Sequence, residues 1–187
     1  MAALLSEQSW SARDLDAVAV GRGPGSYTGL RVGIMSAKTM AYVTGCPLVA
    51  IDTFAVVAGQ TPGGERIDII ADAQKEAVYV QGFEREGASW RPIDVLRILE
   101  FGAWLEGRDA TACVGGPGLA RYRERLPGDV VVTPSDCWTP GLDSVLSLAR
   151  SRLDAGERDD PFALEPLYLR ASSAELQWRD RLGRTPS

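Results

Sequence analysis

The sequence predicts an α/β protein built on parallel strands, and two observations carry this prediction. A short apolar strand at 16–20, a helix to about Thr44, a strand at 48–51 and a short helix at 53–57 follow one another along the chain. Strands that alternate with helices in this order form parallel sheets with right-handed crossovers. The second observation is the elbow at 21–33, where glycines and a proline join the first strand to the first helix.

The elbow predicts a rigid turn with a helix directly behind it. Pro24 fixes its own φ angle, and the flanking glycines can adopt conformations that other residues avoid. Ser26 or Thr28 can accept hydrogen bonds from the first helical amides, which otherwise have no partner. Gly45 and the proline two residues beyond it predict the end of the helix. The apolar positions at helical spacing are Leu30, Ile34, Ala37 and Ala41.

Two uses of the elbow follow from its residues. A helix N-terminus behind a Gly-rich turn favours anions, so phosphate binding is one use. The spacing, however, matches neither the G-x-G-x-x-G nor the G-x-x-x-x-G-K-[ST] nucleotide fingerprint. The other use is structural, because a helix with small residues four apart can approach a partner helix closely. The spacing favours the structural use.

A second α/β unit follows the Gly/Pro-rich linker at 60–65. Two paired strands are expected at 67–71 and 77–83, around a turn that begins at Asp72. Further strands are expected at 89–92, 111–114 and 130–132. Helices are expected from a cap at Asp94 to Trp104, at 119–125 and at 142–153. A Gly-rich turn lies at 115–118, and 165–170 is expected to be extended.

Composition excludes several classes of function. The 187 residues include no histidine, so Ser-His-Asp triads, Cys-His pairs and histidine metal sites cannot be built. The net charge of −5 argues against a large nucleic-acid-binding face. The three cysteines lack C-x-x-C spacing and are expected to be reduced thiols in a cytoplasmic protein. No apolar run is long enough to span a bilayer, so no membrane contact is expected.

The elbow also resembles a known family. The run 23–33, the Gly45-Cys46-Pro47-Leu48-Val49 segment, Asp72-Ala73-Gln74 and the terminal Pro166-Leu167-Tyr168-Leu169-Arg170 resemble the TsaB family in order and spacing. That family supplies the dimerisation subunit of the bacterial machinery that makes threonylcarbamoyladenosine in tRNA. The resemblance covers most of the chain, and the elbow is its most specific part.

The resemblance implies an actin-like, ribonuclease H-like fold with two α/β lobes, here 1–59 and 60–187. It also implies that this chain begins within the first helix of the family. The first lobe would then lack its N-terminal strands, and one strand of its sheet would be left unpaired. The boundary at residue 60 agrees with the Gly/Pro-rich linker, whereas the actin-like lobes and the missing segment are expectations of the resemblance.

The resemblance further implies a non-catalytic scaffold that binds a catalytic TsaD-type subunit. A TsaE-type ATPase would join the complex, and tRNA would be contacted through it. In an ungapped alignment with the catalytic relatives, Thr53 and Val57 stand where two metal-binding histidines are found, so no metal site is expected. No cofactor is expected either, and any nucleotide binding should be weak.

The site residues implied by the resemblance form two groups. The expected partner interface lies on the helix after the elbow: Leu30, Arg31, Gly33, Ile34, Ala37, Lys38 and Ala41. The candidate nucleotide or anion contacts lie in three turns: Gly23, Gly25, Ser26, Thr28, Asp72, Gly115 and Gly116. For the first group the competing interpretation is packing on the chain's own sheet. For the second it is plain turn geometry.

Three other hypotheses stay open beside the scaffold. An actin-like phosphotransferase or ATPase acting alone would use both Gly-rich turns and Asp72, and would need Mg²⁺. A self-sufficient homodimer would associate through the same helix as the heterodimer. A zinc peptidase is disfavoured by the absence of histidine.

Overall fold

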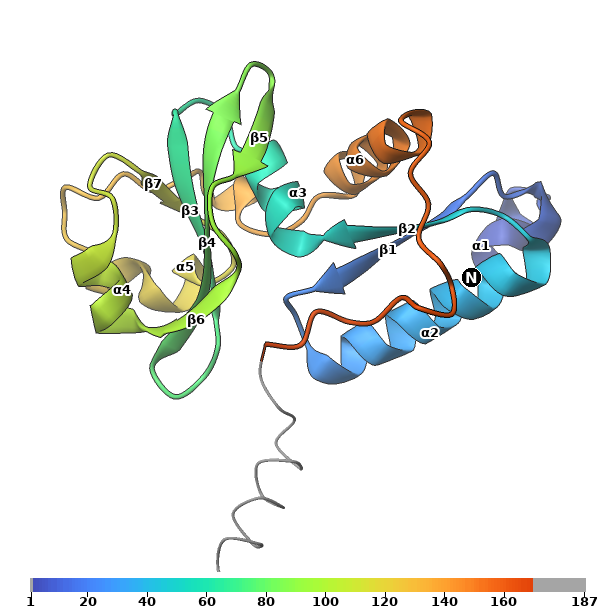
Figure 1. Cartoon of the computed structure of the whole chain (residues 1–187), viewed down its shortest axis with the longest axis horizontal. Helices are drawn as coiled ribbons and strands as arrows, with labels where there is room; N and C mark the ends of the chain where they lie inside the picture. The colour runs from blue at the N-terminus through green and yellow to red at the C-terminus, as the bar shows by residue number, and fades with distance from the viewer. Residues whose placement is uncertain (1, 170–187) are drawn as a thin grey trace, which may run out of the picture.

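The computed structural model describes residues 2–169, which form two sheets with helices packed around them (Figure 1). The first sheet pairs β1 (Val18–Gly23) with β2 (Leu48–Asp52) in parallel, as the order of elements predicts. Helix α2 (Tyr27–Thr44) lies on one face of this sheet and α6 (Leu142–Asp154) on the other. Helix α2 ends at Gly45, which adopts a left-handed φ of 74°. The predicted elbow and helix are therefore confirmed.

The second sheet has the strand order β5 (Ser89–Pro92), β4 (Ala77–Glu86), β3 (Arg66–Asp72) and β7 (Cys113–Gly115). Strand β6 (Arg97–Glu100) pairs with the other end of β4. β3 and β4 are antiparallel, with Asp72 opposite Val78, whereas β3 and β7 are parallel. Helix α3 (Thr53–Gly59) leads from β2 towards this sheet and packs on both.

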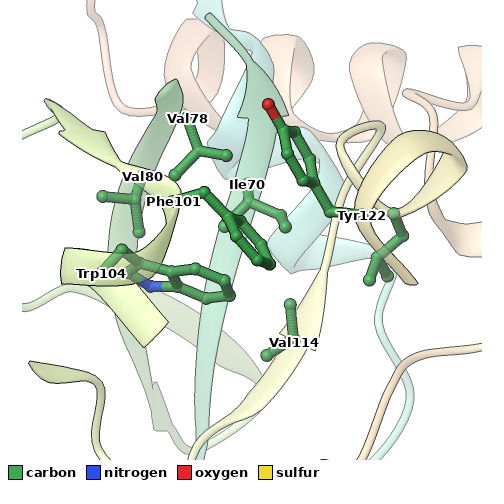
Figure 2. Close-up of a cluster of buried hydrophobic side chains, with 8 residues drawn as sticks. Ile70, Val78, Val80, Phe101, Trp104, Val114 and Tyr122 are labelled. Carbon is green, nitrogen blue, oxygen red and sulfur yellow. The ribbon is translucent and has the colours of Figure 1, made fainter. Parts of the chain in front are cut away.

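The core of the second sheet forms between β3, β4 and two short helices, α4 (Phe101–Gly107) and α5 (Leu119–Tyr122). Figure 2 shows Phe101 and Tyr122 facing each other, and their rings stack with centroids 4.5 Å apart. Trp104 extends this cluster and donates its indole N–H to the Asp68 carboxylate over 3.0 Å. These three aromatic residues are the largest members of this buried cluster.

The remaining elements are α1 (Ala2–Glu7) and three 3₁₀ turns at Ala12–Asp14, Arg123–Arg125 and Ser135–Cys137. Two predicted elements are wrong. Residues 97–100, predicted to be helical, form β6 because their backbone pairs with β4, and α4 starts only at Phe101 with Glu100 as its cap. The strand predicted at 130–132 is reduced to one bridge between Val132 and Val114.

The chain returns to the first sheet after the second is complete. Ala149 of α6 packs on Val49 and Ile51 of β2, and Leu164 packs against α2 and Ala50. The segment 159–168 then runs in front of α2 in Figure 1. Although the split at residue 60 stays a prediction, part of the sequence beyond it is packed on the first sheet. Arg170 and the residues after it lie outside the described part of the chain.

Candidate partner-binding surface

Helix α2 has a buried face that belongs to the chain's own core. Ile34, Ala37 and Ala41 are 2%, 5% and 2% exposed and pack on Leu48 and Ala50. The small side chains of Ala37 and Ala41 let the helix backbone approach the sheet closely. These contacts agree with the competing interpretation, packing on the chain's own sheet, and in this fold a partner cannot reach the three residues without opening the first core.

The opposite face of α2 is apolar and exposed. Val32, Met35, Tyr42 and Val43 are 62%, 60%, 69% and 73% exposed. A shallow groove of about 450 Å³ runs along this face, and Met35, Met40 and Val43 supply its apolar walls. Large side chains clustered on one helix face in water point to a binding surface rather than to scattered exposure. We call Val32, Met35, Thr39, Tyr42 and Val43 the outer face of α2.

The C-terminal segment flanks one edge of the outer face. The Phe162 ring meets Tyr42 edge-on at 5.5 Å between centroids. The Lys38 ammonium donates to the Phe162 carbonyl over 3.5 Å and to the Leu164 carbonyl over 3.1 Å. Lys38, predicted as a partner contact, thus holds the chain's own C-terminal segment against α2.

Arg31 lies at the first turns of α2, inside a cluster with two tyrosines. Its guanidinium lies 4.3 Å from the centroid of the Tyr27 ring, and its Nε donates to the Tyr168 hydroxyl over 3.0 Å. The two tyrosine rings stack at 4.7 Å. Leu30 is half-buried, and a Cβ built on Gly23 would lie 3.1 Å from its Cδ1. Leu30 and Arg31 therefore tie the elbow and the C-terminal segment together.

The elbow is capped by Ser26 rather than by Thr28. The Ser26 hydroxyl accepts the Gly29 amide over 3.3 Å, while Thr28 is exposed on the helix surface. Gly23 is buried with φ of 119°, a conformation that only glycine adopts easily. Gly25 is exposed beside it. Of the candidate anion contacts in the elbow, Gly25, Ser26 and Thr28 face solvent and Gly23 does not.

Asp72 is engaged by its own neighbours. Its carboxylate accepts the Arg121 guanidinium over 3.0 Å, the Gln74 amide over 2.9 Å and the Tyr122 hydroxyl over 3.3 Å. Glu76 pairs with Arg121 and with Arg125, and the hydrogen bond from Arg125 is the main cause that lowers the pKa of its carboxyl. This ion-pair network secures the turn between β3 and β4 to α5 and the turn after it.

The Gly-rich turn at 115–118 is explained by close packing on β3. A Cβ on Gly116 would lie 2.4 Å from the Ile70 carbonyl oxygen, and φ there is 102°. The Gly118 amide donates to that same oxygen over 2.9 Å. Gly115 and Gly116 are buried, so these two candidate nucleotide contacts face the sheet. The seven candidate nucleotide or anion contacts lie in three separate turns, and none of them lines the α2 groove.

Within residues 2–169, no cluster of three or more His, Cys, Asp or Glu side chains is arranged to hold a metal ion. Val57, which the ungapped alignment places at a histidine position of the catalytic relatives, belongs to α3. It is buried in the core between α3 and the second sheet. No helix in the same range combines the length and apolar character that crossing a bilayer requires.

Sequence reasoning did not single out Tyr42 or Phe162, and three of its expected partner contacts lie on the face of α2 that packs on the chain's own sheet. The signal was available in part. On a helical projection, the small residues group on one side while Val32, Met35 and Val43 group on the opposite side. The larger side chains mark the outside of this helix, because the small ones are needed for contact with the sheet.

Comparisons with known proteins agree on one group of relatives. A sequence model of the family described as "TsaD: tRNA N6-adenosine threonylcarbamoyltransferase" matches residues 1–107. An uncharacterised protein of Mycobacterium bovis is 32% identical over 178 residues, which is 92% of this chain and 72% of that one. The tRNA threonylcarbamoyladenosine biosynthesis protein TsaB of Bacillus subtilis is 26% identical over 187 residues, covering 94% and 78% of the two chains. The solved structure of YeaZ from Pseudomonas aeruginosa superposes with a TM-score of 0.74 at 28% identity, covering 88% of this chain and 79% of that one.

Proposed function

The chain belongs to the TsaD family and is a TsaB-type member of it with the actin-like fold, and from this premise we propose that it acts in tRNA threonylcarbamoyladenosine biosynthesis as a non-catalytic subunit. Its task is to bind and stabilise the catalytic threonylcarbamoyl transferase subunit. The complex works in the cytoplasm, where a TsaE-type ATPase joins it, and the chain meets tRNA only as part of the assembly.

The observation that carries this proposal is the outer face of α2. Four large side chains there, those of Val32, Met35, Tyr42 and Val43, are more than half exposed. Met35 and Val43 also line the apolar groove. Burying them against a helix of the partner removes apolar surface from water, at about 25 cal/mol for each Å². Methionine side chains adapt to irregular partner surfaces, and Met35 and Met40 both line the groove. The buried face of α2 meanwhile keeps the helix rigid, so little order is lost on binding.

A scaffold role is also supported by the chemistry that the chain lacks. Without histidine, the sequence cannot supply an imidazole base or a His-ligated metal. Asp72, the carboxylate that a phosphotransferase would use, is already ion-paired with Arg121. We propose on these grounds that the chain by itself transfers no group and binds nucleotide at most weakly.

The test mixes this chain with the catalytic subunit of its own organism and measures the mass of the product by size-exclusion chromatography with light scattering. We expect a 1:1 complex. We also expect that tRNA modification by the reconstituted system needs both subunits, whereas this chain alone gives no turnover. A folded chain that forms no complex, or a complex whose activity is unchanged when this chain is left out, contradicts the proposal.

The alternative is an actin-like ATPase or phosphotransferase acting alone. It predicts Mg²⁺-dependent nucleotide binding by the isolated chain, measurable by calorimetry. It would require Asp72 to leave Arg121 and Tyr122, and the backbone at Gly115 and Gly116 to turn away from β3. No contact among the described residues favours this alternative over the scaffold.

A further inference from the structure

Residues 159–169, which we call the strap, run along the flank of α2. The Asp159 amide donates to the Leu48 carbonyl of β2 over 2.8 Å. Near the other end, the Leu167 amide donates to the Arg22 carbonyl of β1, also over 2.8 Å. Between these two points the strap passes in front of α2 (Figure 1). The strap is therefore fixed to the first sheet near both of its ends.

Two basic side chains of α2 hold the strap between its ends. Arg31 and Lys38 are seven residues apart, so they lie on the same flank of the helix. The Arg31 Nε donates to the Tyr168 hydroxyl over 3.0 Å, and the Lys38 ammonium donates to the Leu164 carbonyl over 3.1 Å. Hydrogen bonds from a charged donor are roughly twice as strong as those between neutral groups. The path of the strap is thus set by α2 as well as by the sheet.

A turn within the strap presents the Phe162 ring to solvent. The Asp160 carboxylate accepts the Phe162 amide over 2.8 Å, and the Asp160 carbonyl accepts the Leu164 amide over 2.9 Å. Leu164 is 8% exposed and belongs to the first core, so it anchors the turn. Phe162 is 77% exposed, the highest value among the large apolar side chains of residues 2–169. Its ring meets Tyr42 edge-on, so apolar surface continues from the outer face of α2 onto the strap.

The outer face of α2 is too small to bind a protein partner stably by itself. Stable interfaces take about 20–30 residues from each side. Helix α2 has 18 residues in all, and Ile34, Ala37 and Ala41 among them are buried against the sheet. A second element must therefore contribute to the partner surface. The strap adjoins the outer face directly, through the contact between Phe162 and Tyr42.

We propose that the catalytic subunit binds a composite surface made of the outer face of α2 and the strap. The Phe162 ring enters an apolar pocket of the partner, and Lys38 is the positioning residue that holds the backbone of the strap beneath this ring. Phenylalanine is enriched in interfaces, and a residue that is held in place before binding loses little freedom on binding. This inference rests on the proposed function and adds to it a contact site outside α2.

The test titrates the full chain with the catalytic subunit of its own organism and compares Phe162→Asp with Val95→Asp. Val95 lies between β5 and β6 and is 74% exposed, so the control makes an apolar-to-acidic change at nearly the same exposure on the second sheet. We expect Phe162→Asp to weaken binding about tenfold or more, and Val95→Asp to bind as the wild type does. The melting temperature of each free variant should stay near that of the wild type, because both side chains are exposed.

The role of Lys38 is tested by Lys38→Met, which keeps the aliphatic stem and removes the ammonium. We expect Lys38→Met to weaken binding and Lys38→Arg to restore it, because arginine keeps a charged donor at this position. A double-mutant cycle with Phe162→Ala separates positioning from direct contact. Lys38→Met should weaken binding no further once Phe162 is alanine. Losses that simply add would overturn the positioning role.

The outcomes separate this inference from the proposed function. Wild-type affinity for Phe162→Asp, in an experiment where Val43→Glu still weakens binding, would overturn the composite surface and leave the proposed function standing. An equal loss for Phe162→Asp and Val95→Asp would also overturn it, because the effect would then not depend on the strap. A folded wild type that does not bind the catalytic subunit would overturn the proposed function, and the composite surface with it.

Discussion

Gly116→Ala should destabilise the second sheet far more than a glycine substitution in an open turn. The φ of 102° is unfavourable for alanine, and the added Cβ would lie 2.4 Å from the Ile70 carbonyl oxygen. The backbone conformation costs roughly 1–2 kcal/mol. The overlap costs about 1–3 kcal/mol, because Ile70 lies in a central strand and cannot move away freely. The expected loss is therefore roughly 2–5 kcal/mol.

Gly87→Ala is the matched control for this substitution. Gly87 also has a positive φ, 63°, but a Cβ there meets nothing within 4 Å. Only the conformational cost of about 1–2 kcal/mol applies. The assay is chemical denaturation followed by tryptophan fluorescence, since Trp104 is buried in the core cluster that includes Ile70, the residue that Gly116 contacts. Equal losses for the two variants would refute close packing as the reason for glycine at 116, and would reopen the turn as a ligand contact.

Three further substitutions test separate parts of the account. Ala37→Arg should lower the melting temperature of the isolated chain strongly, because it places a charge in the first core. Val43→Arg, on the outer face of α2, should leave the melting temperature nearly unchanged. Similar melting temperatures for the two variants would contradict the burial assigned to Ala37. Asp68→Asn should raise the free energy of unfolding at pH 7, because burial raises the pKa of the Asp68 carboxyl and disfavours its ionised form in the fold. The contribution of Asp68 to the free energy of unfolding is favourable below the unfolded pKa of about 3.9 and is lost as the pH rises through the raised folded pKa. The stability gained by Asp68→Asn should therefore disappear in acid. A gain that persists in acid would be inconsistent with this cause. Lys75→Gly should raise the free energy of unfolding by about 1 kcal/mol, because Lys75 has a φ of 51° and lies between two other residues with positive φ. Chemical denaturation measures this change. A loss of stability would show that the ion pairs of Glu76 depend on the lysine.

The elements that sequence predicted well are those with local determinants. Ser26, Gly45 and the spacing between them fix both ends of α2, so its bounds follow from capping chemistry alone. The pairing of β3 with β4 also follows from two apolar runs on either side of a short polar turn. The helix predicted from Asp94 failed because the backbone of 97–100 gains partners on β4, and this tertiary pairing outweighs helical spacing.

The candidate site was harder to predict than the fold. The spacing of Ile34, Ala37 and Ala41 shows that they share a face of α2, but it does not say whether the sheet or a partner covers that face. Contacts between distant segments decide the question, as when Leu164 closes over Ala41 and Lys38 reaches the carbonyls of the C-terminal segment. For Gly116 the sequence shows a turn, and only the proximity of Ile70 explains why glycine is needed there.

The affinity of this chain for the catalytic subunit tests the central claim most directly, measured by titration for the wild type, Val43→Glu and Leu146→Glu. Leu146 lies on α6 and is 54% exposed, so its variant makes the same apolar-to-acidic change on a surface away from α2. The account predicts that Val43→Glu weakens binding at least tenfold, or about 1.4 kcal/mol, while Leu146→Glu binds as the wild type does. Equal affinity for the wild type and Val43→Glu, or a selective loss with Leu146→Glu, would contradict the placement of the partner on the outer face of α2.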